Sequence, residues 1–368
     1  MPEIKFNDFS KEAELRLAEY DKAFKRVLNS GWYILGEEVK KFEEEFSKYL
    51  GIKYCIGVGN GLEALQISLM ALGIGKDDEV ITTPLSAVAT ALSIIAVGAK
   101  PVFVDTNQEA QINADLIEKV ITKKTKAIMP VHLYGQPAEI DKIKEICKRH
   151  NLFLIEDTAQ AHGSTYKGRK LGTYGDVGCF SFYPTKNLGA FGDAGAIVTN
   201  NKKIAAICAE IRDYGQESKY VHIRYGLNSR LDELHAALLK VKLKYLDKDN
   251  EKKRKIAKRY IEKLEGIKGL QIILPKKWND SDFHQFVIKT SKRDELREFL
   301  ARKGIPTLIH FPVSIPDQPF LSKDYGKVKI PVCRELVKSV LSLPCHIMMS
   351  IDQIDYISKE ISNYFGKK

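Results

Sequence analysis

One lysine lies where the sequence predicts that a buried strand ends. Lys186 belongs to the run CFSFYPTKNLGAFGDAG, residues 179–195, between an apolar aromatic stretch and the glycines Gly189, Gly192 and Gly195. Such glycines suit a backbone that turns tightly or approaches another group closely. A lysine is usually a solvated surface residue, and Lys186 taken alone would be interpreted so. At the end of a buried strand, however, desolvation lowers the pKa of the amine and makes it a nucleophile for Schiff-base chemistry.

A glycine-rich turn precedes an apolar helix in KYCIGVGNGLEALQISLMALG, residues 53–73. Gly57, Gly59, Asn60 and Gly61 leave backbone amides accessible at the helix N-terminus, where phosphate groups bind. The motif is not a dinucleotide fingerprint, because Leu62 occupies the position of the third glycine. A plain strand-to-helix turn is the alternative interpretation.

A carboxylate ends another apolar run, LFLIEDTAQAHG, residues 152–163. Asp157 is either a helix cap or ion-pair partner, or a group that holds a proton on a bound heterocycle. Ligands of open α/β sheets bind at the carboxyl ends of the strands, where Asp157 and Lys186 both fall. An amine, a carboxylate and a phosphate-binding turn together predict pyridoxal 5'-phosphate (PLP), with Lys186 as its Schiff-base lysine.

Strands and helices alternate along the segments that must position these groups. Strand-like runs at 79–83, 101–105, 127–132 and 152–157 are separated by helix-like runs at 86–98, 113–121 and 139–151. This order predicts an α/β fold with a mostly parallel, helix-covered sheet. Runs 177–182 and 196–200 follow without an intervening helix, so we expect a hairpin-like, mixed part of the sheet there.

The pattern changes after about residue 231. One long helix is expected from there to about residue 264, followed by short strand-like and helical pieces, with helices near 333–340 and 350–364. We therefore predict a large cofactor-binding domain over residues 1–245, including an N-terminal helical segment. A smaller α+β domain is predicted over residues 246–368.

Composition excludes several classes of protein. The 368 residues are 44% hydrophobic, no apolar run reaches about 18 residues, and the acidic N-terminus lacks a signal-peptide core, so a cytoplasmic protein is expected and no membrane association. Six single cysteines give no disulfide or metal pattern, and no metal is expected. The net charge of +11 comes largely from residues 240–266, which resemble an amphipathic helix with a basic face. Without a nucleic-acid motif, this charge favours an anionic small substrate rather than nucleic acid.

The chain resembles the DegT/DnrJ/EryC1/StrS family of PLP-dependent nucleotide-sugar aminotransferases, of fold type I. The resemblance covers essentially the whole chain and rests on motifs that occur in the family's order: GNGLEAL, DEVITTPLSAVAT, HLYGQPAEID, IEDTAQAHGSTYKGRKLGTYGD, SFYPTKNLGAFGDAGAIVTN, RDYGQESKY, LNSRLDELHAALLKVKL and HFPVSIPDQPF. It implies that Lys186 forms the Schiff base and then shuttles protons. It also implies cofactor contacts for Gly61, Leu62, Asp157, Gln160, Ser181 and Asn228.

The resemblance further implies a homodimer with shared active sites. Asn228 would reach the phosphate bound by the neighbouring subunit, whereas Arg230 is functional or structural. L-Glutamate would donate its amino group, leaving the pyridoxamine 5'-phosphate form, and a nucleotide-linked keto sugar would accept it. The wording NSRLDELHAALLKVKLKYLD is similar to members acting on dTDP-3-keto-6-deoxyhexoses, which implies a 3-amino-3,6-dideoxyhexose for surface glycan biosynthesis. Amination at C-4 or another PLP-dependent sugar modification is the alternative, and a non-catalytic binder is a third reading.

Two stretches depart from the family's wording. Ala87 stands where members commonly place an aromatic residue against the cofactor face, and HFPVSIPDQPF, residues 310–320, differs from the commoner form. Candidate substrate contacts are Tyr33, Tyr183, Tyr214 and His310, each of which is alternatively a packed aromatic or core histidine. His132 is expected to be structural.

Overall fold

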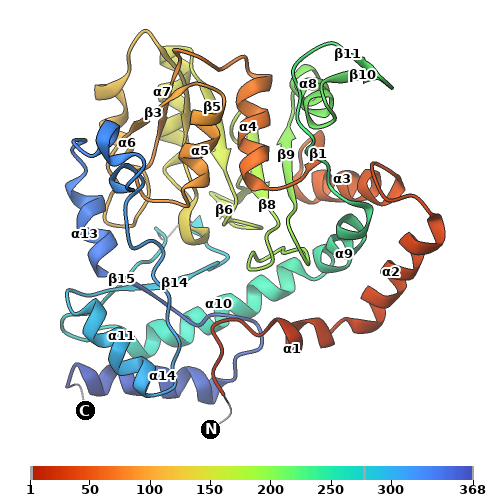
Figure 1. The fold of residues 1–368 in the computed structure, drawn as a ribbon. Coiled ribbons are helices and arrows are strands. Elements are labelled where there is room, and N and C mark those ends of the chain that lie inside the picture. Colours follow the sequence, from red (N-terminus) through yellow and green to blue (C-terminus); the bar gives the residue numbers. More distant parts are fainter. Residues whose placement is uncertain (1–2, 277–278, 367–368) are drawn as a thin grey trace.

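Seven short strands form a central sheet in the computed structural model, which describes residues 3–276 and 279–366. Their order is β1 (Tyr54–Val58), β9 (Gly195–Thr199), β8 (Val177–Ser181), β5 (Phe153–Asp157), β4 (Thr125–Met129), β2 (Glu79–Thr82) and β3 (Lys100–Phe103). Strands β8, β5, β4, β2 and β3 are mutually parallel, and only β9 pairs antiparallel with its neighbours β8 and β1. The predicted mostly parallel sheet and its hairpin-like part are therefore confirmed (Figure 1).

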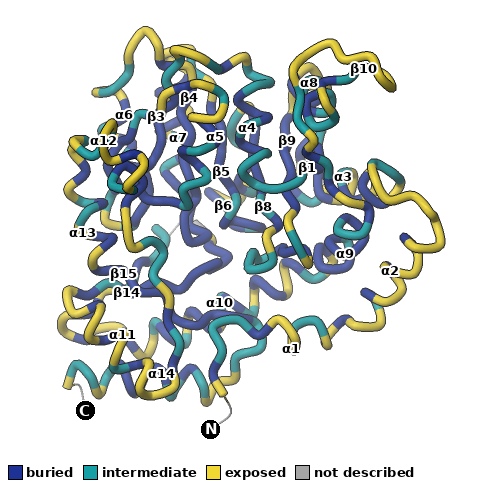
Figure 2. The backbone as a smooth tube through the Cα atoms, viewed as in Figure 1, coloured by how far each residue is buried: buried dark blue, intermediate teal, exposed yellow. Residues whose placement is uncertain are grey.

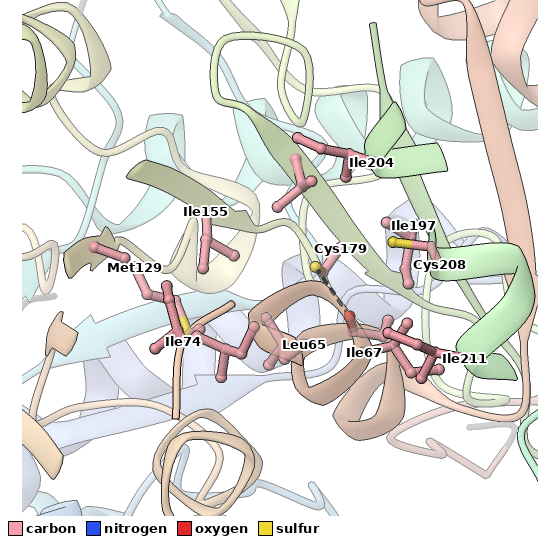
Figure 3. Packing of buried hydrophobic residues seen from close by; sticks show 14 of the residues in the cluster. Leu65, Ile67, Ile74, Met129, Ile155, Cys179, Ile197, Ile204, Cys208 and Ile211 are labelled. Carbon is pink, nitrogen blue, oxygen red and sulfur yellow. Dashed lines mark hydrogen bonds between the residues drawn. The ribbon is translucent and has the colours of Figure 1, made fainter. Parts of the chain in front are cut away.

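Side chains alternate between the two faces of this sheet, as the period of a strand requires. Ile155 and Cys179 pack beneath one helical layer, which Figure 3 shows, whereas Leu154 and Phe180 point to the opposite layer. The first layer contains α4 (Gly61–Ala71), α5 (Ala89–Ala96) and α8 (Lys202–Arg212). The second contains α3 (Glu37–Leu50), α6 (Ala114–Ile117), α7 (Ile140–His150) and α9 (Glu233–Leu243). Burial on both faces explains the nearly continuous apolar strands.

The expected single helix from residue 231 to residue 264 is wrong, because the chain forms two helices there. Helix α9 ends at Leu243, and α10 (Leu246–Leu264) begins after a break at Tyr245. The Tyr245 hydroxyl donates to the Glu19 carboxylate at 2.6 Å, and the Arg16 guanidinium lies 4.4 Å from the centre of its ring. These contacts with the N-terminal segment accompany the change of direction between the two helices.

A second, antiparallel sheet lies beside α10 and has the order β12 (Gln271–Ile272), β14 (Phe286–Lys289), β15 (Val340–Leu343). It packs with α11 (Arg293–Arg302), α13 (Pro331–Ser339) and α14 (Ile351–Tyr364). The helix expected near 333–340 therefore ends at Ser339, and the next four residues are a strand paired with β14. Ile4 packs into the core of this region although it lies at the other end of the sequence.

Short elements connect these layers. They are η1 (Glu118–Val120), η2 (Leu133–Gly135), η3 (Ile315–Asp317), α12 (Ser322–Tyr325), the pair β10 (Gln216–Ser218) and β11 (Val221–His222), and a sheet of β13 (Asn279–Asp280), β6 (Thr165–Tyr166) and β7 (Arg169–Lys170).

The N-terminal helices α1 (Phe9–Glu14) and α2 (Leu17–Ser30) form an arm along one side of the molecule (Figure 1). Much of α2 is exposed, as Figure 2 shows, including Leu17 and Leu28. Within residues 3–276 and 279–366, no helix combines the length and apolar character needed to cross a membrane.

Candidate active site

Lys186 lies in a tight turn just beyond β8. Its backbone N–H donates to the Tyr183 carbonyl at 2.8 Å, which closes the turn. A Cβ atom at Gly189 would collide with the Pro184 carbonyl, and one at Gly195 would lie 2.5 Å from the Asn60 carbonyl. The expectation that these glycines permit close approaches is therefore confirmed at both positions.

Desolvation dominates the electrostatics of the Lys186 amine. It lowers the pKa of Lys186 to about 8, against the opposing attraction of the Asp157 and Asp282 carboxylates. A larger fraction of this amine is therefore neutral near neutral pH than for an ordinary lysine. A neutral amine is the form that attacks a carbonyl or accepts a proton.

Asp157 is the last residue of β5 and is buried. Its carboxylate accepts from the Thr90 hydroxyl at 2.9 Å and from the Ala159 N–H at 3.2 Å. Burial raises the pKa of Asp157, whereas these two hydrogen bonds and the Lys186 charge oppose that rise. The sequence analysis did not select Thr90. The run SAVAT carries this hydroxyl in the first turn of α5, the helix that follows β2.

The N-terminus of α4 and the end of β8 form a cradle. The Asn60 side chain caps α4 by accepting from the Glu63 N–H at 2.9 Å. Gly61 and Leu62 follow it, and no partner for their backbone N–H groups lies within the described residues. A Cβ atom at Gly61 would lie 2.5 Å from that of Ser181, so the hydroxyl is held against these open amides. Open amides, a hydroxyl and a helix N-terminus suit a phosphate group.

Gln160 is buried and engaged in a backbone contact. Its side-chain oxygen accepts from the Tyr134 N–H at 2.8 Å, and the Tyr134 hydroxyl donates to the His310 carbonyl. The His310 ring lies 2.9 Å from the Ser342 hydroxyl. Burial and the nearby Lys186 charge lower the pKa of His310 to about 4, so this ring is neutral at neutral pH.

Buried polar residues that were not selected from the sequence also surround the lysine. Burial and the Lys186 charge lower the pKa of His162 to about 3, and burial raises the pKa of Asp282 to about 7. The separate His132 ring contacts the Glu156 carboxylate at 3.0 Å and accepts from the Ala138 N–H at 3.2 Å. That arrangement occupies both ring nitrogens of His132 inside the fold.

The remaining sequence candidates lie at the surface of the chain. Tyr33, Tyr183 and Tyr214 are exposed, as is Asn228, whose backbone forms a bridge with Asp213. Tyr183 lies in the same turn as Lys186, whose backbone N–H donates to the Tyr183 carbonyl. The substrate and phosphate contacts expected of these four residues stay predictions. The partly exposed Ala87 lies just before α5.

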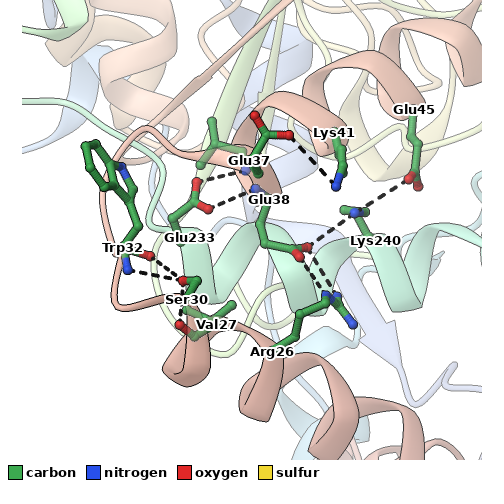
Figure 4. A network of polar contacts seen from close by, with 11 residues as sticks. Arg26, Val27, Ser30, Trp32, Glu37, Glu38, Lys41, Glu45, Glu233 and Lys240 are labelled. Atoms are coloured by element: carbon green, nitrogen blue, oxygen red, sulfur yellow. Dashed lines mark hydrogen bonds and ion pairs between the residues drawn. The ribbon is translucent and has the colours of Figure 1, made fainter.

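The segment from Leu227 to Glu233 contacts several loops near the site. The Ser229 hydroxyl accepts from the Gly59 N–H at 3.0 Å, next to the cradle. Glu233 is buried and accepts from the N–H groups of Gly36, Glu38 and Val39 at the start of α3, at 2.7–2.9 Å (Figure 4). This segment therefore joins the cradle to the loop that carries Tyr33.

The residues present fit PLP: a desolvated amine, a buried carboxylate and a phosphate cradle are each in place. The chain matches the DegT/DnrJ/EryC1/StrS aminotransferase family over residues 16–362. A relative from Aneurinibacillus thermoaerophilus, named dTDP-3-amino-3,6-dideoxy-alpha-D-galactopyranose transaminase, is 44% identical and covers 94% of this chain and 95% of its own. A relative from Geobacillus stearothermophilus, named pleiotropic regulatory protein, is 42% identical over 97% of each chain.

A solved structure supports the same family assignment by its similarity in three dimensions. The crystal structure of Streptomyces venezuelae DesV in complex with a ketimine intermediate has a TM-score of 0.97 to this chain, with 39% sequence identity over 99% of each chain. The predicted fold class is thereby confirmed, together with the cofactor. Since the family match spans nearly the whole chain and includes Lys186 and Asp157, this protein belongs to the DegT/DnrJ/EryC1/StrS family and is a PLP-dependent aminotransferase.

Proposed function

We propose that the protein transfers the amino group of L-glutamate to C-3 of a dTDP-linked 3-keto-6-deoxyhexose. The products are 2-oxoglutarate and a dTDP-3-amino-3,6-dideoxyhexose for surface glycan biosynthesis. The observation that carries this proposal is the 44% identity to a dTDP-3-amino-3,6-dideoxy-galactopyranose transaminase over nearly the whole chain. The net charge of +11 agrees with two anionic substrates.

The cofactor, when bound, supplies the aldehyde that takes up the amino group and the ring that withdraws electrons from the reacting carbon. We assign Lys186 to hold the aldehyde and to move the proton at the reacting carbon. Asp157 would pair with the ring nitrogen, and the hydrogen bonds from Thr90 and the Ala159 amide favour its ionised form. Gly61, Leu62 and Ser181 would bind the phosphate, and Gln160 would lie near the ring.

A second copy of the chain completes the site in this proposal. The arm and the region near β10 expose large apolar side chains, which is unusual for a surface that stays in water. They are Leu17, Leu28, Trp32, Tyr33, Phe191, Tyr214, Tyr220, Val221, Ile223 and Tyr225. Burying them in a homodimer would bring Asn228 of one chain to the phosphate of the other. Tyr33, Tyr183, Tyr214 and His310 then contact the nucleotide sugar.

We also propose the division of the chain at residues 245 and 246, and a cytoplasmic location. The start of α10 at Leu246 supports the division, although Ile4 packs with the C-terminal region. All six cysteines are free and buried, as expected for a reducing compartment.

A regulatory role is a second candidate, because one relative is named a regulatory protein. Binding alone does not call for a desolvated amine and a buried carboxylate together with a phosphate cradle. The combination therefore favours catalysis. Within catalysis, C-4 amination or another sugar modification remains the alternative outcome of the experiment below.

A half-reaction panel tests the proposal. The protein is loaded with pyridoxamine 5'-phosphate and mixed separately with dTDP-3-keto-6-deoxyglucose, dTDP-3-keto-6-deoxygalactose and dTDP-4-keto-6-deoxyglucose. We expect a 3-keto sugar to restore the absorbance of the pyridoxal form and to yield a 3-amino sugar by mass spectrometry and NMR. Restoration by the 4-keto sugar alone would overturn the C-3 assignment, and no restoration by any sugar would favour the regulator.

A further inference from the structure

The residue that follows Lys186 is tied to the C-terminal part of the chain. The Asn187 side-chain amide donates to the Asn250 side-chain oxygen at 2.8 Å and to the Asp282 carbonyl at 3.0 Å. Asn250 lies on α10, and Asp282 lies between β13 and β14. Both hydrogen atoms of the amide nitrogen are therefore used in contacts to elements outside the central sheet.

The oxygen of the same side chain is also engaged. It accepts from the Lys253 ammonium at 2.9 Å and lies 3.4 Å from a ring nitrogen of His284. The Lys253 ammonium donates in addition to the His284 carbonyl at 3.2 Å. Asn187 thus binds two separate segments at once, α10 and residues 282–284, so its contacts fix a single position of the turn.

The partners of Asn187 are themselves anchored. The Asn250 amide donates to the His162 carbonyl at 2.7 Å, and the Asp282 N–H donates to the Ser164 hydroxyl at 2.9 Å. Asn250, Asp282 and Lys253 are all buried. The partners of Asn187 in this hydrogen-bonded network are therefore held in place by hydrogen bonds of their own.

Lys253 is an unusual member of this network. Its ammonium is buried, and no carboxylate within the described part of the chain lies at ion-pair distance from it. A buried charge with neutral acceptors is costly unless those acceptors are held firmly. The Asn187 oxygen is one of the two acceptors, so the lysine and the asparagine hold each other in place.

We propose that Asn187 is a positioning residue that fastens the Lys186 turn to α10 and residues 282–284, and so keeps the Lys186 amine in the desolvated pocket that it shares with Asp157 and Asp282. This inference rests on the proposed function in one respect, since it takes Lys186 as the reactive amine. It follows that the C-terminal elements determine how far water reaches this amine. Releasing the turn would hydrate the amine and make it behave as an ordinary lysine.

The test measures the pKa of the Lys186 amine in the absence of cofactor and substrate. The full-length protein, freed of cofactor, is acetylated briefly at a series of pH values, and the labelling of Lys186 is quantified by mass spectrometry. Only the neutral amine reacts, so the midpoint of the profile gives its pKa, which we expect near 8 in the native protein. In Asn187→Ala the midpoint should rise by about one pH unit or more, towards the value of an ordinary lysine.

Two further variants make the test specific. Asn250→Leu removes the side-chain oxygen that accepts from the Asn187 amide, while it keeps the size of the side chain and adds no charge. The labelling midpoint of Lys186 in this variant should also rise. The double variant should shift no further than Asn187→Ala, because the effect of Asn250 on the Lys186 turn passes through Asn187. Asn201→Ala, which removes the cap of α8 away from this network, is the matched control and should leave the midpoint unchanged.

A native-like midpoint in folded Asn187→Ala, or a shift of equal size in Asn201→Ala, would overturn the proposal. If Asn187→Ala does not fold, Asn250→Leu alone decides, with the same two outcomes. Because no sugar takes part in the labelling, failure here is distinguishable from failure of the proposed transamination.

Discussion

The desolvation that prepares Lys186 for chemistry works against the stability of the cofactor-free protein. The pKa of this amine is about 8 in the folded state and 10.5 for an ordinary lysine. Below pH 8 both states carry the proton, and the folded state holds a poorly hydrated ammonium. Between pH 8 and 10.5 the unfolded state binds a proton that the folded state has released, so stability rises with pH in this window.

Replacing Lys186 by methionine therefore has opposite effects on activity and stability. We expect Lys186→Met to abolish transamination and to raise the unfolding free energy of the cofactor-free protein at pH 7 by roughly 1–3 kcal/mol. The gain should shrink as the pH approaches 10, and thermal unfolding at pH 7 and pH 10 measures it. Exposed Lys203→Met is the control; an equal gain there, or none at Lys186, contradicts the prediction.

Thr90 affects the site through the charge on Asp157. Thr90→Val removes a hydrogen bond to the buried carboxylate while keeping the shape of the side chain, so the pKa of Asp157 should rise further. We expect cofactor affinity to fall by roughly ten- to a hundredfold, because a hydrogen bond to a charged group contributes about 1.5–3 kcal/mol.

An absorbance titration with PLP measures this change. Thr199→Val is the matched control, since that buried hydroxyl donates to the Asp176 carbonyl at the far end of β9. It should lower stability without changing cofactor affinity. Equal affinities of Thr90→Val and the native protein would show that the hydroxyl does not support the carboxylate.

At the scale of elements, the start of α3 depends on one side chain from α9. Glu233 accepts from three backbone N–H groups there, the N-cap residue Gly36 has no side chain to cap the helix, and a helix N-terminus favours a negative charge. Glu233→Ala should lower the unfolding free energy by roughly 2–4 kcal/mol, because three backbone donors, two of them buried, lose their acceptor. Hydrogen exchange of residues 36–39 should accelerate markedly.

Glu37→Ala is the control on the same turn of α3, because Glu37 is exposed and forms a surface ion pair with Lys41, at 3.8 Å (Figure 4). It should change stability by less than about 0.5 kcal/mol. If residues 36–39 remain protected in Glu233→Ala, the start of α3 does not depend on this carboxylate.

The sequence was informative wherever local pattern and backbone geometry decide the structure. The alternating runs predicted the sheet, and glycine spacing predicted the close approaches at Gly189 and Gly195, because both are properties of short segments. Contacts between distant segments left no such signal. The helical pattern is interrupted at Tyr245, which contacts Glu19 of the distant N-terminal segment, and β15 pairs with β14, from which about fifty residues separate it.

The same distinction applies to the candidate site. Lys186 and Asp157 follow apolar strands and could be selected from that placement. The packing of separate elements brings Thr90 to Asp157, and His162 and Asp282 to the surroundings of Lys186. No spacing in the sequence therefore indicated these three residues. The positions of Tyr33 and Asn228 relative to the site depend on a second chain and stay predictions.

At the scale of the whole molecule, the proposed shared site makes a prediction that a single chain cannot satisfy. If Asn228 serves the neighbouring subunit, a mixed dimer of one Lys186→Ala chain and one Asn228→Ala chain contains one intact site. That site takes Lys186 from the second chain and Asn228 from the first. Its companion site lacks both residues, and neither parent homodimer has an intact site.

Refolding the two variants together therefore tests the shared site directly. Equal amounts should give mixed dimers as half of all dimers, so about a quarter of all sites should recover native cofactor affinity and turnover. Absorbance titration and the half-reaction measure both, and sedimentation confirms the dimer. If Asn228 instead serves its own chain, the chain with Lys186 lacks Asn228 in every mixed dimer, and no native site appears. The recovered fraction thus distinguishes a site built across two chains from one built within each.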